Sequence, residues 1–490
     1  MDFLTQLSHS TTQATPLLLL LATGLILMLL DVFKVKAALP WVTATGLIIS
    51  SVLAYTMGSP ESDVIFSGMI ESGGIAPTVH ILLCLSGLLT LFFLTDYLNR
   101  QEKPIYDIYA LLIFAIIGMI LMANANDLII TFIGLETMSI CLYIFAAVFK
   151  KDARSNESGL KYFLLGSFAS AFLLFGISLI YGIGASTNLN ELSVNGALFQ
   201  SNELIFYTAV GLILIGFLFK ISAFPFHNWT PDVYEGTPTP LAGFMATGSK
   251  MAAFIALGVI IQKLDLIQYD KIVTILAVSS LFTMVYGNIV AAQQNNVKRM
   301  LAYSSIAHSG YVMLGLLAGA IGFTAVIFYM FIYTLMNLGA FGMVGMAERE
   351  YEDTSMENWR GLGLKAPYFA GILSIFLFSL AGIPPLAGFM AKYQIFITAI
   401  RENMVFLAVV GILASVIGAY YYIRLIVIMF FGKDEQPNLN IIYNGVPIAG
   451  TVILVLLILL LGVFPNLVLD PIDTVTRMAG SIPKNLSVVP

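Results

Sequence analysis

The stretch VPIAGTVILVLLILLLGVF, residues 446–464, contains no charged side chain in nineteen consecutive positions. A second block, PLLLLLATGLILMLL at residues 16–30, has the same character. An α-helix rises about 1.5 Å per residue, so about 20 apolar residues cross the roughly 30 Å hydrocarbon core of a bilayer. Across the 490 residues, 59% are hydrophobic and only 10% are charged, against about 45–50% and about 25% in soluble domains. The sequence therefore predicts an integral membrane protein.

Apolar runs between polar breaks predict an all-α integral membrane fold of about fourteen transmembrane helices. The longest breaks, near 59–74, 186–203 and 348–366, are too short to hold a soluble domain. No glycine-rich phosphate loop followed by Lys and Ser or Thr occurs. Cys84 and Cys141 lie inside apolar runs without the spacing of a metal site, which favours simple burial. The predicted helices cover residues 15–33, 38–58, 75–98, 106–124, 127–149, 158–185, 204–226, 240–262, 270–292, 298–319, 323–347, 367–398, 404–430 and 444–465.

The lysines and arginines predict the orientation of these helices, because basic residues near helix ends favour the cytoplasmic side. The first apolar block is predicted to be a retained helix, since no basic leader of a secretory signal precedes it. One set of connecting segments holds thirteen basic residues and the other set holds five. This asymmetry predicts that both termini lie on the non-cytoplasmic side. The thirteen are Lys34, Lys36, Arg100, Lys103, Lys150, Lys151, Arg154, Lys298, Arg299, Arg349, Arg360, Lys365 and Lys433, and the five are Lys263, Lys271, Arg401, Arg477 and Lys484.

Five ionisable residues fall deep inside predicted helices. An ionisable group near the bilayer centre costs about 2.5–3.5 kcal/mol on insertion scales, so it usually faces a polar interior and has a function. Glu136 lies about nine residues into the fifth helix, which places it about 13–14 Å deep. The candidate site residues are Glu136, Lys220, Lys250, His308 and Lys392.

Two of these lysines lie in helices that proline and glycine interrupt. Lys220 precedes ISAFPFH, residues 221–227, and Lys392 follows GIPPLAG, residues 382–388. Proline removes a helix hydrogen bond, and broken backbone at membrane depth is tolerated where protein or water satisfies the freed groups. Burial favours the neutral form of a lysine, whereas a nearby carboxylate favours the charged form. These lysines are therefore predicted to accept and release protons.

The spacing of these residues along the chain indicates an internal repeat. Glu136 in the fifth predicted helix corresponds to His308 in the tenth, and Lys220 in the seventh corresponds to Lys392 in the twelfth. The offset is five helices in both cases. Because five is odd, the two repeats would cross the membrane in opposite senses, as the inverted repeats of many transporters do.

Some of these residues could instead have purely structural roles. Glu136 and the buried lysines could form structural ion pairs, and His308 could be a neutral packing residue. Lys161, early in the sixth helix, could extend toward the membrane surface or assist proton uptake. A further group borders the seventh helix and could form a proton inlet or a helix-end cap with a subunit contact: His227, Trp229, Asp232 and Glu235.

The chain resembles the antiporter-like membrane subunits of respiratory complex I, and among these most nearly subunit N. The matching motifs cover nearly the whole chain and are GLETMS (134–139), KISAFPFHNWTPDVY (220–234), SSIAHS (304–309) and AGIPPLAGFMAK (381–392). The resemblance implies two inverted five-helix repeats at 106–262 and 263–432. A three-helix flank at 1–105 precedes them, and a C-terminal helix and tail at 433–490 follow.

The same resemblance implies roles for the candidate residues. Glu136 would pair with Lys220, Lys250 would connect the half-channels, and His308 would lead to Lys392 on the exit side. Proton movement through this chain would be driven by quinone reduction in other subunits of the complex. These other membrane and peripheral subunits would hold the quinone, FMN and iron–sulfur clusters. This chain would bind no cofactor, metal or nucleic acid, and would lie in a bacterial inner membrane.

Two other functions compete with this interpretation. The related Mrp-type cation/proton antiporters share most of the motifs, although a lysine at position 392 provides no acidic cation site. A scaffold of helices that carries no protons would gain little from buried lysines. Subunit N is favoured over the L and M types because M-like subunits have an acidic residue where Lys392 stands, and an L-like chain would continue into a long lateral helix.

Overall fold

The computed structural model describes residues 3–101, 105–194, 196–348, 354–432 and 445–478. Its helices in the first half of the chain are α1 (Phe3–Gln13), α2 (Thr15–Val32), η1 (Lys36–Ala38), α3 (Leu39–Met57), α4 (Ala76–Asn99), α5 (Ile108–Ala123), α6 (Leu128–Ala146), α7 (Ala153–Gly184), α8 (Leu189–Val194), α9 (Gly196–Ser201), α10 (Glu203–Lys220), α11 (Trp229–Gly236) and α12 (Thr239–Lys263). Those in the second half are η2 (Leu266–Gln268), α13 (Asp270–Gln293), α14 (Val297–Leu317), α15 (Gly319–Ala347), η3 (Met356–Trp359), α16 (Leu362–Lys365), α17 (Pro367–Ala381), α18 (Ala387–Arg401), α19 (Val405–Phe431), α20 (Gly445–Val463) and α21 (Asn466–Met478).

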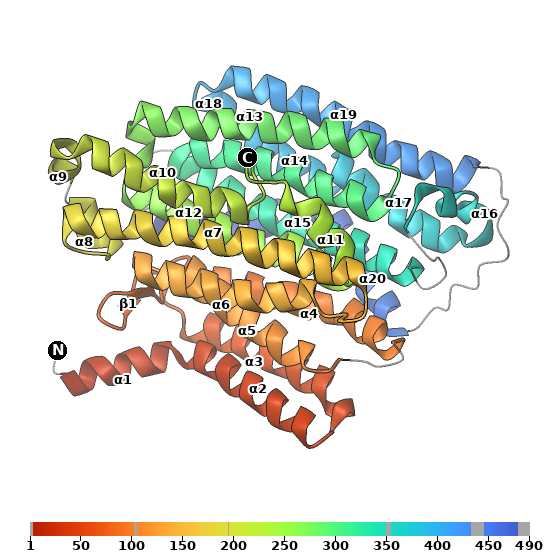
Figure 1. Ribbon diagram of the computed structural model, residues 1–490, viewed down its shortest axis with the longest axis horizontal. Coiled ribbons are helices and arrows are strands. Elements are labelled where there is room, and N and C mark those ends of the chain that lie inside the picture. Colours follow the sequence, from red (N-terminus) through yellow and green to blue (C-terminus); the bar gives the residue numbers. More distant parts are fainter. Residues whose placement is uncertain (1–2, 102–104, 195, 349–353, 433–444, 479–490) are drawn as a thin grey trace.

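The long helices run side by side along the long axis of the molecule (Figure 1). A two-stranded antiparallel hairpin, β1 (Val64–Ile65) and β2 (Ile70–Glu71), lies with α8 and α9 at one end, and α16 lies at the other. We call these the hairpin end and the α16 end. The predicted all-α membrane fold is confirmed.

Twelve helices in the described part of the chain are long and apolar enough to cross a membrane. Two shorter apolar helices, α5 and α17, have 16 and 15 residues. Every predicted transmembrane stretch coincides with a helix, or with a helix pair where the chain breaks, but the total of fourteen crossings remains a prediction. Four basic residues used to predict the orientation lie outside the described residues: Lys103, Arg349, Lys433 and Lys484.

Several helices were not predicted because they lack a long apolar run. The first, α1, is a polar helix of 11 residues, and α8, α9 and α16 are six residues or shorter. The last, α21, is amphipathic: it buries Leu469 and Ile472 while Asp470 is exposed. A search for continuous apolar blocks detects none of these patterns.

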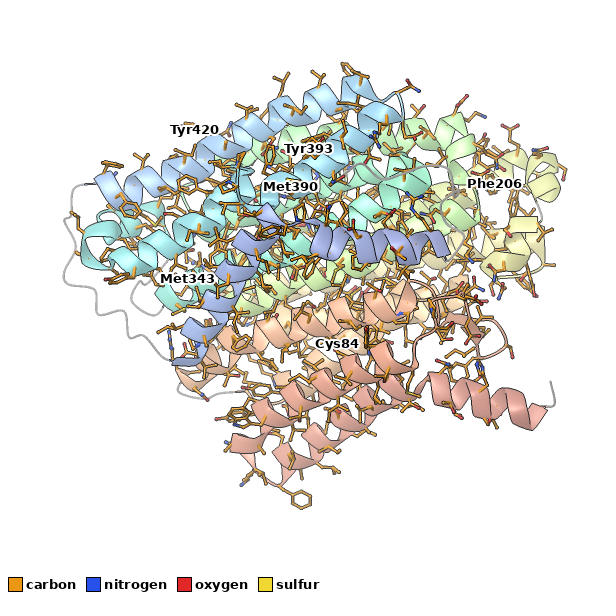
Figure 2. The ribbon with its side chains drawn as sticks, turned by 180° about the vertical axis from the view of Figure 1, so that it is seen from behind. Cys84, Phe206, Met343, Met390, Tyr393 and Tyr420 are labelled. Atoms are coloured by element: carbon orange, nitrogen blue, oxygen red, sulfur yellow. The ribbon has the colours of Figure 1, made fainter. Side chains whose placement is uncertain are left out.

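The centre of the bundle is formed by α12, α14 and α15. In their most apolar stretches, 94%, 94% and 83% of the positions are buried, against 28% in α2. A helix that is apolar all round must be buried or face lipid, and the outer helices place their large apolar side chains outward. Tyr420 of α19 is an example (Figure 2). The central helices carry Lys250 and His308.

Two helix pairs approach each other through glycine. A Cβ added to Gly134 of α6 would lie 2.4 Å from the Met122 nitrogen of α5, and one added to Gly118 would lie 2.4 Å from the Met138 nitrogen. The same arrangement joins α13 and α14, where a Cβ on Gly287 would lie 2.6 Å from the Ala307 nitrogen. Small residues allow such close backbone contact between membrane helices.

Candidate functional site

Lys220 is the last residue of α10 and is 3% exposed. Its ammonium group donates hydrogen bonds to the Ser139 hydroxyl at 2.8 Å and the Tyr162 hydroxyl at 3.3 Å. Ser139 lies one helical turn after Glu136 on α6, so the two side chains share a face. The expected Glu136–Lys220 ion pair is absent among the described contacts, and Glu136 Oε1 is buried without a hydrogen-bond partner. Ser139 instead connects the lysine to the helix that carries the carboxylate.

The break between α10 and α11 confirms the predicted interruption of the seventh helix. The Trp229 indole N–H donates to the Phe219 carbonyl at 3.0 Å, and the Phe224 N–H donates to the Thr283 hydroxyl at 2.8 Å. Trp229 also stacks on Tyr162 with ring centroids 4.5 Å apart. Side chains thus satisfy backbone groups that the lost helical turn would leave free. Trp229 therefore has the structural role that was one of its two predicted alternatives.

Lys250, in the middle of α12, is 1% exposed. Its ammonium group donates to the Ser305 carbonyl, the Ser305 hydroxyl and the Ser309 hydroxyl, each at 3.0 Å. All three acceptors belong to α14, and none of them is charged. Lys250 thus joins the two predicted repeats through three uncharged oxygen atoms of Ser305 and Ser309, which we call the neutral cage.

His308 lies on α14 between the two serines and is 3% exposed. Its Nδ1 is 2.7 Å from the Tyr329 hydroxyl and its Nε2 is 3.3 Å from the Tyr422 hydroxyl. The Tyr422 hydroxyl also hydrogen-bonds to Ser304. Both ring nitrogens therefore contact hydroxyl groups that can donate or accept, so the histidine can exchange a proton on either side.

Lys392, on α18, is 6% exposed. It donates to the Ala381 carbonyl at 2.9 Å and the Ser415 hydroxyl at 2.8 Å, and it lies 5.5 Å from the centroid of the Tyr311 ring. Ala381 is the last residue of α17, where the helix dipole presents its negative end. The predicted break of the twelfth helix, between α17 and α18, is thus used to hold the lysine.

The sequence did not single out two tyrosines that fill the space between these groups. The Tyr234 hydroxyl is buried close to the Ser222 and Ser305 side chains, without a hydrogen bond of good geometry among the described residues. The Tyr333 hydroxyl is likewise buried and lies close to Ser305. Because Ser222 follows Lys220 by two residues and Ser305 contacts Lys250, Tyr234 lies between the two lysines. Tyr333 lies in the apolar helix α15, where a tyrosine resembles ordinary packing, and Tyr234 lies in the short polar helix α11 without any charge to mark it, which is why both were missed.

A surface ion-pair network joins α7, α11 and α14. Lys161 contacts Glu157 at 2.6 Å and Asp232 at 2.8 Å, while Arg299 contacts Asp232 at 3.0 Å and Glu235 at 2.5 Å. Burial raises the pKa of Asp232, but the hydrogen bonds from Lys161 and Arg299 outweigh it and hold that pKa below its usual value. Two members of the network, Asp232 and Glu235, were predicted to border a proton inlet or cap a helix end, and the ion pairs fit the structural alternative. Lys161, which was predicted to extend toward the membrane surface or to assist proton uptake, is part of the same network.

His227, which was predicted to border the same inlet or cap as Asp232 and Glu235, is not in the network. It is 3% exposed, both of its ring nitrogens lack a hydrogen-bond partner, and its ring contacts Phe224 and Tyr286. His227 is therefore a packed, buried histidine beside the break that follows Lys220.

A buried ion pair that the sequence did not reveal lies beside a polar cavity of 390 Å³. Lys298 donates to the Thr237 carbonyl at 2.7 Å and to Glu348 at 3.1 Å, and Glu348 also accepts from the Thr239 hydroxyl at 2.6 Å. Lys298 was predicted to be a loop cation, but it is the second residue of α14 and only 4% exposed. The pair links the N-terminal ends of α12 and α14 to the C-terminal end of α15.

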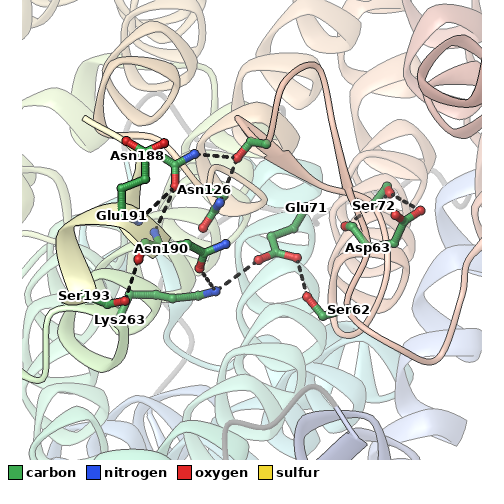
Figure 3. Close-up of polar contacts among 11 residues, drawn as sticks. Ser62, Asp63, Glu71, Ser72, Asn126, Asn188, Asn190, Glu191, Ser193 and Lys263 are labelled. Atoms are coloured by element: carbon green, nitrogen blue, oxygen red, sulfur yellow. Dashed lines mark hydrogen bonds and ion pairs between the residues drawn. The ribbon is translucent and has the colours of Figure 1, made fainter. Parts of the chain in front are cut away.

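At the hairpin end, a polar network anchors the end of α12 (Figure 3). Lys263 donates to Asn190 at 2.7 Å and to Glu71 at 3.2 Å, which joins α12 to α8 and β2. Asn126 and Asn188 each donate to the Gly68 carbonyl at 2.8 Å. The network fixes the outer end of the helix that carries Lys250. Among the described residues, no group of three or more His, Cys, Asp or Glu side chains could hold a metal ion.

Comparisons with known proteins identify the family of this chain. The model of the NADH:quinone oxidoreductase/Mrp antiporter transmembrane family matches residues 125–418. The chain is 40% identical over 422 residues to NADH-quinone oxidoreductase subunit N 1 of Chloroherpeton thalassium, covering 85% of this chain and 88% of the relative.

Solved structures agree. A chain of respiratory complex I from Thermus thermophilus is 32% identical with a TM-score of 0.78, over 93% of this chain and 98% of that one. A chain of the Mrp complex from Dietzia sp. shares the fold at 19% identity, with a TM-score of 0.84 over 96% of this chain and 97% of that one. The resemblance found in the sequence is thus confirmed, and the chain belongs to the NADH:quinone oxidoreductase/Mrp antiporter family of transmembrane proteins as a homologue of subunit N.

Proposed function

We propose that this chain is a proton-translocating membrane subunit of an NADH-quinone oxidoreductase. The observation that carries the proposal is the set of hydrogen-bond partners of three buried lysines, Lys220, Lys250 and Lys392. The fourth buried lysine among the described residues, Lys298, is paired with Glu348. Lys220, Lys250 and Lys392 donate only to hydroxyl and carbonyl oxygens among the described residues. A carboxylate in contact would fix the proton on the lysine, whereas a hydroxyl can also donate to the neutral amine. Such lysines can alternate between charged and neutral forms at moderate cost.

The route runs from Glu136 and Lys220 through Lys250 and His308 to Lys392. Tyr234 lies between Lys220 and the Ser305 cage of Lys250. From that cage, His308 follows Ser305 by less than one helical turn. Tyr311 extends the route, since its ring lies beside both His308 and the Lys392 ammonium group. The nearest charged groups act on one another through the low local dielectric, so a proton gained at one lysine favours its release at the next.

The two repeats, 106–262 and 263–432, would each form one half of this route. This division into two repeats is supported by the matching glycine contacts of α5 with α6 and of α13 with α14. It is also supported by the presence of one broken helix in each repeat. The flank at 1–105 and the segment 433–490 would lie outside them. Inverted repeats of this kind let one half open to each side of the membrane in turn.

The redox chemistry would belong to partner subunits. This chain would assemble with the other membrane and peripheral subunits of the complex, which would carry quinone, FMN and iron–sulfur clusters. It would lie in a bacterial inner membrane with both termini on the non-cytoplasmic side. The α16 end would then face the cytoplasm, in line with the excess of basic residues in the segments on that side.

A stand-alone cation/proton antiporter is the alternative function, and its support is the fold shared with the Mrp complex. Lys392 opposes it, because an ammonium group buried at the end of the row repels a metal cation.

The test replaces Lys220 with Ala in the native membrane, with Lys271→Ala as the control. Lys271 is an exposed lysine of α13 that pairs with Glu203 and lies outside the proposed proton route. After assembly is verified, quinone reduction and proton uptake are measured in inverted vesicles. We expect Lys220→Ala to reduce both at least tenfold while Lys271→Ala changes neither. Unchanged proton uptake per electron in Lys220→Ala would refute the role of Lys220, and sodium transport by the isolated chain would favour the antiporter.

A further inference from the structure

A cavity of 910 Å³ lies between α2, α5 and α6, apart from the proton route. Its wall is mostly apolar and includes Met28, Leu111, Phe114 and Ile144. Its rim is polar and charged, with Gln101, Asp107, Lys150 and Lys151. The volume falls in the range of about 300–1,000 Å³ that binding sites for organic molecules occupy.

Helix packing explains why this space exists. In the middle of the bundle, α5 and α6 touch at Gly118 and Gly134, and α2 touches α5 where Gly24 meets the Phe114 ring. The cavity begins beyond these contacts, where Met28 lies one turn past Gly24 and Ile144 lies nearly three turns past Gly134. On the α16 side of these glycine contacts, the three helices therefore leave a mostly apolar space between them.

The rim carries an unusual pair of cations. Lys150 and Lys151 are adjacent and exposed, and neither has an ion-pair partner among the described residues. The turn that presents them is held by side chains: Asn156 donates to the Lys150 carbonyl at 3.0 Å, and Ser155 donates to the Ala146 carbonyl at 2.9 Å. The backbone of the turn is thus fixed, and it presents both lysine side chains at the mouth of the cavity.

The N-terminus of α5 adds to this positive potential. Ile108 and Ala110 of its first turn line the cavity, and the Asp107 side chain does not cap the helix. The positive end of the helix dipole therefore faces the same mouth. Asp107 is the only acidic residue in the lining, against two lysines, and its carboxylate interacts with Asp31 of α2, which also interacts with Lys36. The helix dipole adds to the positive potential of the two lysines.

We propose that this cavity binds one anionic glycerophospholipid, in addition to the lipid that surrounds the bundle. Its phosphate would lie between Lys150 and Lys151, and an acyl chain would extend along Leu111 and Phe114 toward Met28. Basic pockets at the cytoplasmic surface of membrane helices favour anionic head groups, and every CH₂ group buried against the apolar wall adds to the affinity. An uncharged lipid or an apolar helix of a neighbouring subunit would provide no anionic partner for either lysine.

The position of the site suggests what the lipid does. Ile144 follows Glu136 by eight residues on α6, which is about 12 Å along the helix. A lipid wedged beside Ile144 would brace the half of α6 that lies between the membrane surface and the buried carboxylate. The site thus lies next to the first group of the proposed route without belonging to it.

The test uses a phosphatidylglycerol with a diazirine in one acyl chain, and the phosphatidylcholine analogue for comparison. Both are exchanged into the purified complex, crosslinked by light, and mapped by peptide mass spectrometry. The Lys150→Gln/Lys151→Gln variant removes the rim charge, and Leu111→Trp fills the cavity without changing charge. The matched control is Lys271→Gln/Lys365→Gln, which removes two lysines outside the cavity lining.

We expect phosphatidylglycerol to crosslink to residues 105–114 and 144–149, at least fivefold more than phosphatidylcholine. The Lys150→Gln/Lys151→Gln variant should lower this yield at least fivefold, Leu111→Trp should abolish it, and the control variant should not change it. Equal yields for the two lipids would overturn the role of the lysines. Crosslinks that are absent, or that survive Leu111→Trp, would overturn the site itself.

Discussion

Removing the hydroxyls around Lys250 should slow proton transfer without removing any titratable group. Ser305→Ala/Ser309→Ala deletes two of the three acceptors of the ammonium group and leaves the Ser305 carbonyl. A hydrogen bond to a charged group contributes about 1.5–3 kcal/mol, and a neutral one contributes about 0.5–1.5 kcal/mol. Each lost hydroxyl therefore disfavours the charged lysine relative to the neutral amine by about 1 kcal/mol. Two of them disfavour it by about 2 kcal/mol, or roughly 30-fold in proton occupancy.

The assay is coupled quinone reduction and proton uptake in inverted vesicles. We expect the double variant to assemble normally and to lose up to about 30-fold in both rates, because proton transfer is limited by the least occupied group of the route. Ser249→Ala is the matched control: this buried serine neighbours Lys250 on α12, but its hydroxyl donates to the Met245 carbonyl at 2.6 Å. If both variants pump like the parent protein, the neutral cage does not set the protonation of Lys250 and the reasoning fails.

Three further predictions concern other parts of the site. His308→Gln keeps a hydrogen-bonding side chain but cannot titrate, so it should assemble and lose proton uptake; full uptake would make His308 a packing residue. Gly382→Ala should impair pumping, because Gly382 has φ +86°, which disfavours a side chain, and because the new Cβ would lie 3.0 Å from Lys392 Cδ. Normal pumping in a normally assembled complex would contradict this prediction. Asp232→Asn should lower the thermal unfolding temperature of the complex equally at about pH 6 and about pH 8. The reason is that the pKa of Asp232 is held below its usual value, so its contribution is lost only as pH falls through that lowered pKa; a deficit that vanished at about pH 6 would be the contrary result.

The membrane fold was predictable because its signal is simple. A bilayer requires long apolar helices, and each predicted stretch coincides with one or with a broken pair. The breaks after Lys220 and before Lys392 were also predictable, because proline and glycine cluster there. Short polar helices such as α1 and α8 were not, since their sequences contain no continuous apolar block.

The candidate site was predictable in its charged members but not in their contacts. A lysine inside an apolar run is conspicuous, whereas its partners, such as Ser305 and Tyr234, look like ordinary helix residues. The absence of a direct Glu136–Lys220 contact depends on the relative rotation of α6 and α10, which no local pattern specifies. Lys298 was assigned to a loop because it lies at a helix end, and its burial depends on Glu348 from a distant helix.

The most direct test of the central claim is the number of protons moved per quinone reduced in a Lys250→Met complex. Methionine keeps most of the side-chain volume and removes the charge. NADH oxidation with an artificial acceptor, which bypasses the membrane subunits, reports that the complex remains intact. We expect this bypass activity to persist while coupled turnover falls at least tenfold, or while fewer protons move per quinone. Unchanged turnover together with an unchanged proton ratio would contradict it and make the buried lysines structural.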